Sequence, residues 1–261
     1  MELGLGGQNA IVTGASRGIG RAIAIELARE GMRVALTARD QSGLEATAQQ
    51  LTGLGAPAPV VVARDLTRPE AAGEIVEEAL EALGALDLLV NNAGATKRGA
   101  FLELDDADHL DGFALKYHGA RRMCRHAWPH LKGRGGRIVN IIGAGARTPS
   151  ADFTVGGPVN SALLNLTKAL AALGLEDGIR VNAINPGPIE TGRLTNWIER
   201  TAQEKGIDVD EARRIWLERA GLTRFGRPEE IGRLVAFLAS DQSGFVHGAS
   251  VDIDGGVTRG I

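Results

Sequence analysis

The chain has 261 residues with a formal net charge of −3 at neutral pH, and it contains one cysteine, Cys124. The length allows one large α/β domain with a substantial core, and the lack of a basic block argues against binding to nucleic acid or to an anionic membrane surface. No apolar run approaches the ~20 residues that span a bilayer. The N-terminus lacks the apolar length of a signal peptide and a lone cysteine suits a reducing compartment, so we expect a cytoplasmic protein.

The first predicted elements are a strand at residues 10–12, a glycine-rich turn and a helix at residues 21–29. The turn reads Thr13-Gly14-Ala15-Ser16-Arg17-Gly18-Ile19-Gly20. A strand, a glycine turn and a helix in this order can place a phosphate on the helix N-terminus. Gly14 would permit the tight turn, Gly18 would let the backbone approach a pyrophosphate, and Gly20 would let the helix pack close to the sheet. Dinucleotide binding is therefore the favoured interpretation, and a purely structural turn is the alternative.

Strands and helices alternate along the rest of the chain. Further strands are predicted at 33–37, 60–62, 86–90, 137–142, 179–184 and 250–253, and further helices at 41–54, 69–83, 105–131 and 160–173. Alternation of this kind is typical of a parallel sheet with crossover helices. No repeat or linker is visible, so the sequence predicts a single doubly wound α/β domain over residues 1–261, with helices on both faces of the sheet.

Residues 189–222 interrupt this alternation with a charged, helical segment that holds Trp197 and Trp216. Ligands of doubly wound folds bind beyond the carboxyl ends of the strands, and this segment follows the sixth strand at that edge. We therefore expect a substrate lid at about 189–222. The alternative is a surface helix pair whose two tryptophans pack inward.

Five motifs in this order resemble the short-chain dehydrogenase/reductase family over nearly the whole chain. They are the glycine turn, Asp65, Asn91-Asn92-Ala93-Gly94, Asn185-Pro186-Gly187-Pro188-Ile189-Glu190-Thr191, and a C-terminal region with Arg224-Phe225-Gly226-Arg227-Pro228-Glu229-Glu230-Ile231 and Asp252-Ile253-Asp254-Gly255-Gly256. The resemblance implies a Rossmann fold, a nicotinamide dinucleotide, a small-molecule substrate and a homotetramer or homodimer.

The resemblance also implies which residues bind the dinucleotide. Asp65 would accept a hydrogen bond from the adenine amino group, and Asn91 and its neighbours would line the adenine ribose. The predicted set is Gly14, Ser16, Arg17, Gly18, Ile19, Gly20, Arg39, Asp65, Leu66, Asn91, Ala93, Gly94, Pro186, Gly187, Ile189 and Thr191, of which the last four would hold the nicotinamide end. Plain structural roles are the alternative: Asp65 could cap the next helix, and Pro186-Gly187 could be a turn.

The choice between NAD and NADP rests on the residues after the second strand. NAD binding needs a carboxylate there for the ribose 2′-hydroxyl, whereas this chain has Thr37-Ala38-Arg39 and a second guanidinium at Arg17. Guanidinium groups suit a phosphate, so NADP(H) is predicted over NAD(H). Asp40 could act in the opposite sense by pairing with Arg39 or repelling a phosphate, and both arginines could be solvated surface charges.

The family's catalytic residues do not match this sequence. The family uses an Asn in the long helix, a Ser after the fifth strand and a Tyr-x-x-x-Lys pair that opens the next helix. The corresponding residues here are Lys116, Gly143, Gly156 and Asn160. A glycine cannot transfer a proton, and the only tyrosine, Tyr117, is one position further along the helix, a turn of ~100°. The catalytic residues are therefore unassigned, with Lys116 as the best candidate.

Three interpretations of the function follow. The favoured one is an NADP(H)-dependent oxidoreductase of carbonyl or alcohol substrates with a non-standard proton relay. Lys116 could then donate a proton or stabilise an alkoxide, because a buried lysine shifts its pKa readily. Asp152, His118 and a water are weaker candidates, and Lys116 could also be a snorkelling or salt-bridged lysine without a chemical role. The alternatives are a non-redox lyase, dehydratase or isomerase on the same scaffold, and a non-catalytic nucleotide-binding subunit or sensor. No metal site is predicted, since the five histidines do not form a convincing ligand set.

Overall fold

Seven parallel strands form one sheet in the order β3-β2-β1-β4-β5-β6-β7 in this computed structural model, which describes residues 2–259. Every strand pair is parallel, with Ile11 of β1 opposite Ala35 of β2 and Leu89 of β4. The strands are β1 (Asn9–Thr13), β2 (Arg33–Ala38), β3 (Val60–Ala63), β4 (Leu88–Asn91), β5 (Arg137–Ile141), β6 (Arg180–Pro186) and β7 (Ser250–Ile253).

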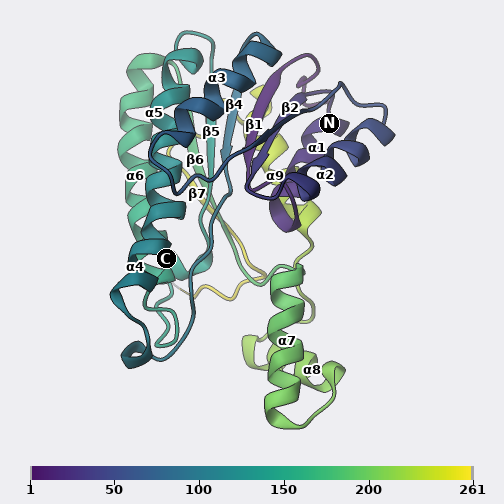
Figure 1. Ribbon diagram of the computed structural model, residues 1–261, viewed down its shortest axis with the longest axis vertical. Coiled ribbons are helices and arrows are strands. Elements are labelled where there is room, and N and C mark those ends of the chain that lie inside the picture. The colour runs from purple at the N-terminus through teal and green to yellow at the C-terminus, as the bar shows by residue number, and fades with distance from the viewer. Residues whose placement is uncertain (1, 260–261) are drawn as a thin grey trace.

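Helices cover both faces of the sheet, with α1, α2 and α9 on one side and α3, α5 and α6 on the other (Figure 1). They are α1 (Gly18–Arg29), α2 (Gln41–Gly53), α3 (Ala71–Leu83), α4 (Asp106–Gly112), α5 (Ala120–Leu131), α6 (Gly156–Asp177), α7 (Gly192–Lys205), α8 (Val209–Ala220) and α9 (Pro228–Ala239). A π-helical segment, Phe113–Gly119, joins α4 to α5 without a break. This arrangement confirms the predicted doubly wound α/β fold.

Two apolar cores hold the layers together. One lies between the sheet and α1, α2 and α9, and the other lies between the sheet and α3 and α5. The central strands are buried on both faces, as continuous apolar runs such as Leu88-Leu89-Val90 require. Burial of this apolar surface is the main favourable term in folding. Several predicted site residues lie at or just after the carboxyl ends of the strands, among them Arg39 after β2, Asp65 after β3 and Asn91 at the end of β4.

The order of the strands reverses between β1 and β4, where the chain switches from one half of the sheet to the other. Thr13 at the end of β1 fixes this point, because its Oγ1 accepts hydrogen bonds of 2.9 Å from the backbone N–H groups of Asn92 and Ala93. The Asn92 side chain returns a bond of 3.0 Å to the Thr13 carbonyl. The glycine turn and the segment after β4 are thereby joined where doubly wound folds bind their ligands.

Several predicted boundaries were wrong. Helix α6 begins at Gly156 rather than 160 because its first turn contains two glycines and a proline, which weaken the helical pattern. Helix α3 begins at Ala71, so Pro69 precedes it instead of occupying its first turn. The sequence reading missed α9 as an element, although Pro228 at its first position and Glu230 two residues later are typical start signals.

Helices α7 and α8 form an arm that projects from the body of the molecule (Figure 1). The arm has a small core of its own, built from Ile198, Ala202, Ala212 and Phe225. Trp216 packs against Phe225 with ring centroids 5.1 Å apart and the rings tilted by 60°, and Trp197 meets Trp216 edge to face at 5.8 Å. The segment 189–222 is therefore helical as predicted, with its tryptophans facing one another. Its role as a lid stays a prediction.

Candidate active site

The glycine turn between β1 and α1 has the backbone that its sequence requires. Gly14 and Gly18 have φ angles of +68° and +57°, which side chains rarely permit. Gly20 allows α1 to approach the strand end, because a Cβ at this position would collide with the Gly14 carbonyl. A Cβ on Gly14 would lie 2.8 Å from the Asn92 amide nitrogen. The turn is thus tight against the segment after β4, and a phosphate could rest on the N-terminus of α1.

The neighbouring turn residues have mixed surroundings. Ser16 is buried and its carbonyl accepts a hydrogen bond from Arg21, whereas Arg17 is exposed. Ile19 packs partly against the first core. Arg17 is therefore the member of the turn that is free to meet an anion, while Ser16 and Ile19 help to shape the turn.

The structure shows different partners for Arg39 and Asp40, the two charged residues that follow β2. Asp40 caps α2, where its Oδ1 accepts hydrogen bonds from Gly43 N at 3.1 Å and Ser42 Oγ at 2.9 Å. These bonds lower the pKa of Asp40 and hold its carboxylate at the helix end. Arg39 instead extends toward Asp65, with 3.8 Å between Nη1 and Oδ2. Arg39 is therefore near Asp65 and largely exposed, while the Asp40 carboxylate is engaged at the helix cap.

Asp65 has a local role as well as its predicted one. Its Oδ1 accepts bonds from the N–H and hydroxyl of Thr67, at 3.0 and 2.9 Å. Oδ2 remains directed toward Arg39. Leu66 is buried under the glycine of the π-helical segment, Gly119. The turn after β3 is therefore a fixed platform beside Arg39, consistent with an adenine site.

A buried polar chain supports the segment after β4. The Asn91 side chain donates to Asn140 Oδ1 at 2.9 Å and to Cys124 Sγ at 3.2 Å, and Asn140 donates to Thr167 at 2.9 Å. Burial raises the pKa of the Cys124 thiol to about 12, so the thiol stays protonated. Asn91 thus anchors β4 to β5 and α5, and Ala93 and Gly94 are the residues at the open edge.

The segment after β6 reaches the glycine turn from the opposite side. Gly187 N donates to Ile253 O at 3.1 Å, and a Cβ on Gly187 would lie 2.5 Å from Asp254 Cβ. Ile189 is buried and pairs with Gly226 in a short parallel bridge. Thr191 Cγ2 lies 3.5 Å from the point where a Cβ on Gly18 would stand. Thr191 is therefore the member of this segment that lies against the glycine turn, while Gly187 and Ile189 are fixed by the C-terminal region.

The positions predicted to correspond to the family's catalytic residues do come together. Gly143 has φ +132°, and the Asn160 amide nitrogen lies 3.2 Å from a Cβ built there. Asn160 is 3% exposed, and its Oδ1 has no hydrogen-bond partner within residues 2–259. Gly156 opens α6 beside them, and the ring of Phe153 fills the space that a side chain on Gly156 would need. Phe153 was not named from the sequence. Its position three residues before Gly156 was the available signal, because a nearby aromatic ring can fill the space that a glycine leaves.

Lys116 is the one titratable side chain among these four positions. Its stem passes over Gly94, whose Cβ would lie 2.9 Å from Lys116 Cδ, and its Nζ donates to the carbonyl of Ile142. Burial and, secondly, the charge of Arg193 lower the pKa of Lys116 to about 7. Lys116 therefore spans from β4 to β5 and ends beside Gly143. An ammonium in this position can donate a proton near neutral pH.

Arg193 was absent from the predicted set. It is the second residue of α7, and its Nη2 donates to the Gly94 carbonyl at 3.0 Å. Burial of its guanidinium and the nearby Arg17 lower the pKa of Arg193. The signal in the sequence was weak, because an arginine two residues after Thr191 resembles the other arginines of the arm.

The other candidate proton donors have surroundings that do not favour this role. Asp152 accepts hydrogen bonds from Ser150 and Arg98, which keep its pKa low and its carboxylate ionised. Burial lowers the pKa of His118, so its imidazole is neutral near pH 7. Tyr117 packs between the rings of Phe113 and His118. Of the candidates named from the sequence, Lys116 is the one whose nitrogen bonds the carbonyl next to Gly143.

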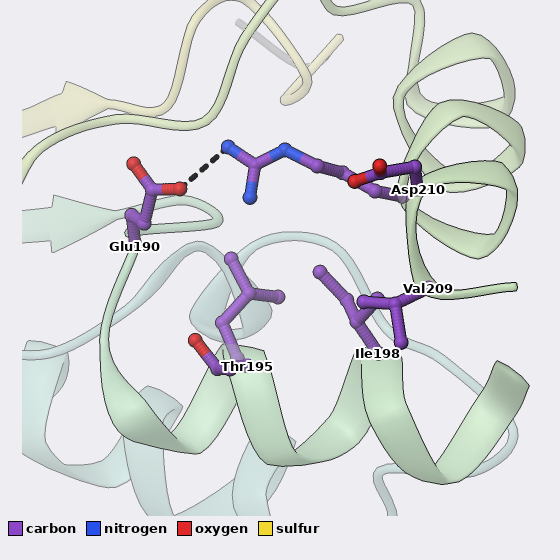
Figure 2. A pocket seen from close by; sticks show the side chains of 7 residues that line it. Glu190, Thr195, Ile198, Val209 and Asp210 are labelled. Atoms are coloured by element: carbon purple, nitrogen blue, oxygen red, sulfur yellow. Dashed lines mark hydrogen bonds and ion pairs between the residues drawn. The ribbon is translucent and has the colours of Figure 1, made fainter. Parts of the chain in front are cut away.

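Two cavities lie along the arm. The smaller, about 70 Å³, lies between α7 and α8, and Figure 2 shows Glu190 on one side of it, Val209 and Asp210 on the other, and Thr195 and Ile198 on α7. It is too small for a nucleotide. The larger, about 380 Å³, lies at the base of the arm and is lined by residues that include Pro188, Leu222 and Asp254. Within residues 2–259 no cluster of His, Cys, Asp or Glu suits a metal ion, and no helix is long and apolar enough to cross a bilayer.

A family model described as enoyl-(acyl carrier protein) reductase matches residues 14–258. The chain belongs to the short-chain dehydrogenase/reductase family. L-rhamnose 1-dehydrogenase (NAD(P)(+)) of Azotobacter vinelandii is 35% identical over 254 residues, which cover 95% of each chain. An uncharacterized oxidoreductase of Mycobacterium tuberculosis is 35% identical over 95% of this chain and 91% of its own.

Solved structures agree with this assignment. L-sorbose reductase from Gluconobacter frateurii, complexed with NADPH and L-sorbose, superposes with a TM-score of 0.95 at 31% identity and full coverage of both chains. The match includes the sheet, its crossover helices and the arm, because it spans the whole chain. This member of the family is therefore an oxidoreductase with a nicotinamide-dinucleotide fold. The family resemblance predicted from the five motifs is confirmed.

Proposed function

We propose that this protein is an NADP(H)-dependent oxidoreductase that interconverts a carbonyl and an alcohol, with Lys116 in place of the family's tyrosine as proton donor and acceptor. The observation that supports this most is the position of Lys116 Nζ, beside Gly143 and bonded to the Ile142 carbonyl. Gly143 and Gly156 offer no side chain for proton transfer. The proposal thus makes this chain an atypical family member.

The glycine turn fits a dinucleotide. A Cβ on Gly14 or Gly20 would collide with Asn92 or with the Gly14 carbonyl, so the shape of the turn depends on these glycines. Arg17 and Arg39 would present guanidinium groups to the phosphates. Arg39 would bind the 2′-phosphate, since the Asp40 carboxylate is held at the α2 cap. The buried hydroxyl of Thr37 has no partner within residues 2–259 and lies on β2 beside this position. Preference for NADP(H) over NAD(H) follows from these charges.

In the reductive direction NADPH supplies the hydride to the carbonyl carbon. The Lys116 ammonium would then give one proton to the carbonyl oxygen and become a neutral amine, which solvent reprotonates. Asn160 would orient the substrate oxygen, because its amide lies next to Gly143 where the family has a serine. Phe153 would form an apolar wall, and Arg98 holds this ring with its guanidinium carbon 4.1 Å from the centroid.

The experiment is a screen of NADPH oxidation with carbonyl compounds, starting with L-sorbose and, in reverse, NADP⁺ with L-rhamnose, the compounds named for the relatives. NADPH consumption that matches alcohol formation supports the proposal. Product formation without net change in NADPH would indicate a lyase, dehydratase or isomerase instead. Tight NADPH binding with no turnover of any compound would indicate a non-catalytic nucleotide-binding protein.

A further inference from the structure

Two cations at the carboxyl edge have carbonyl groups, not carboxylates, as partners. Arg193 donates to the Gly94 carbonyl and Lys116 donates to the Ile142 carbonyl. No ion pair joins either of them to a carboxylate within residues 2–259. Other arginines of the arm differ, because Arg200 pairs with Glu204 at 2.7 Å and Arg214 pairs with Glu218 at 2.7 Å. Arg200 and Arg214 are thus neutralised by glutamates of the arm. Within residues 2–259, the charge of Arg193 at the base of the arm has no carboxylate partner.

The arrangement brings like charges together. Arg193 and Lys116 both meet Gly94, because Arg193 Nη2 donates to its carbonyl at 3.0 Å and Lys116 Cδ lies 2.9 Å from the point where a Cβ on Gly94 would stand. In keeping with this geometry, the charge of Arg193 helps to lower the pKa of Lys116, and the charge of Arg17 helps to lower the pKa of Arg193. Three segments of the chain supply these groups: the glycine turn, the π-helical segment and the start of α7. Arg17 and Arg193 are exposed and Lys116 is half-buried, and nearby like charges repel one another. A bound anion would offset this repulsion and give the cations charge-assisted hydrogen bonds.

We propose that Arg193 and Lys116 form an oxyanion-binding site between the end of β4 and the base of the arm. The Arg193 guanidinium would leave the neutral Gly94 carbonyl for the anion, which is the stronger partner. The anion is either the pyrophosphate of the dinucleotide or a carboxylate on the substrate. The inference rests on the proposed function, since both sources assume that the dinucleotide lies over the glycine turn. Because Arg193 begins α7, the bound anion also fixes the base of the arm.

The test compares the wild-type protein with Arg193→Gln, which keeps a donor for the Gly94 carbonyl, and with Arg200→Gln as a matched control on the same helix. Calorimetric titrations use inorganic pyrophosphate, NADPH, and oxalate added to the NADPH complex. Arg193→Gln is expected to weaken binding roughly 10- to 100-fold for the anion that occupies the site, while Arg200→Gln leaves it unchanged. Lys116→Met, with one charge removed, is expected to weaken the same probe.

The probes separate the two sources. Weaker binding of pyrophosphate and NADPH assigns the site to the dinucleotide, and weaker binding of oxalate alone assigns it to the substrate. Arg193→Gln that binds all three probes as tightly as the wild-type protein would overturn the inference. Wild-type protein that binds pyrophosphate through Arg193 but does not bind NADPH would keep the anion site and reject the proposed function. A thermal melt of each variant verifies that it is folded.

Discussion

The ring of Phe153 occupies the space into which a side chain on Gly156 would project. A side chain at position 156 would therefore collide with this ring. A Cβ on Gly145 would also come within 2.8 Å of the same ring. Arg98 covers the ring from outside and pairs with Asp152 at 2.7 Å. Position 156 therefore lacks a tyrosine, and the ring of Phe153 fills the space between Gly145 and Gly156.

Gly156→Tyr is expected to destabilise the protein by about 1–3 kcal/mol, the usual cost of overpacking. Phe153→Ala should relieve this cost, so a double-mutant cycle should give a coupling free energy of about 0.5–3 kcal/mol. Gly157→Ala is the matched control, since its Cβ would make only an ordinary contact of 3.5 Å and alanine favours a helix. Chemical denaturation measures all four variants. Additive effects of Gly156→Tyr and Phe153→Ala would contradict the packing described for this site.

Lys116 should control the pH dependence of catalysis. For reduction, kcat/KM should be constant below the pKa of about 7 and fall as the ammonium loses its proton above it. For alcohol oxidation the dependence should reverse, because the neutral amine is the base. Lys116→Met should lower the rate roughly 10²- to 10⁴-fold and abolish this pH dependence, whereas Lys168→Met, an exposed lysine on α6, should leave both unchanged. A pH profile of Lys116→Met that keeps the wild-type inflection would exclude Lys116 as the acid.

Lys116 should also affect stability. Its folded-state pKa of about 7 lies below its ordinary value of 10.5, so between these two values the unfolded chain binds more protons than the folded chain. This group therefore makes the protein less stable at pH 7 than at pH 10. Lys116→Met should raise Tm at pH 7, and the gain should shrink as the pH rises toward 10.5. A gain in Tm that is constant over this range would mean that Lys116 keeps an ordinary pKa.

Arg39→Asp should reverse the cofactor preference. The lost guanidinium and the added carboxylate should weaken NADPH binding roughly 10- to 100-fold, the usual range for a hydrogen bond to a charged group. NADH binding should improve, because a carboxylate can accept from the ribose 2′-hydroxyl. Arg200→Asp makes the same charge change far out on α7 and is the control. An unchanged ratio of the two affinities in Arg39→Asp would show that Arg39 is only a surface charge.

The parts of the fold that local chemistry determines could be predicted from the sequence. Buried strands such as Leu88–Asn91 and the glycines of the first turn could be identified because apolar runs, turns and helical segments alternate in order along the chain. Element ends were less predictable. Helix α6 starts at a Gly-Gly-Pro sequence because Val155, Gly156 and Gly157 are buried, and tertiary packing outweighs their weak helical propensity.

The candidate site was predictable only in its cofactor half. Asp65 could be named from the order of the motifs, and Arg39 from its place after the second strand. That Asp40 caps α2 and does not pair with Arg39 needed the structure, because the sequence alone does not distinguish these two roles of an aspartate. Lys116 could be named from its position, but not its reach to the Ile142 carbonyl. Phe153 and Arg193 could not be named because their contacts are tertiary. The Phe153 ring fills the space beside Gly156 at the start of α6, and Arg193 donates to the carbonyl of Gly94. Sequence patterns of one helix or strand cannot show such contacts.

The most direct test of the account is a titration of the nucleotide-free protein with NADPH and with NADH, followed by nicotinamide fluorescence. The charges at Arg17 and Arg39 predict tight binding of NADPH and clearly weaker binding of NADH. That result would support the cofactor site and the oxidoreductase function built on it. Failure to bind either nucleotide would contradict the account, and tighter binding of NADH would contradict the roles of Arg17 and Arg39.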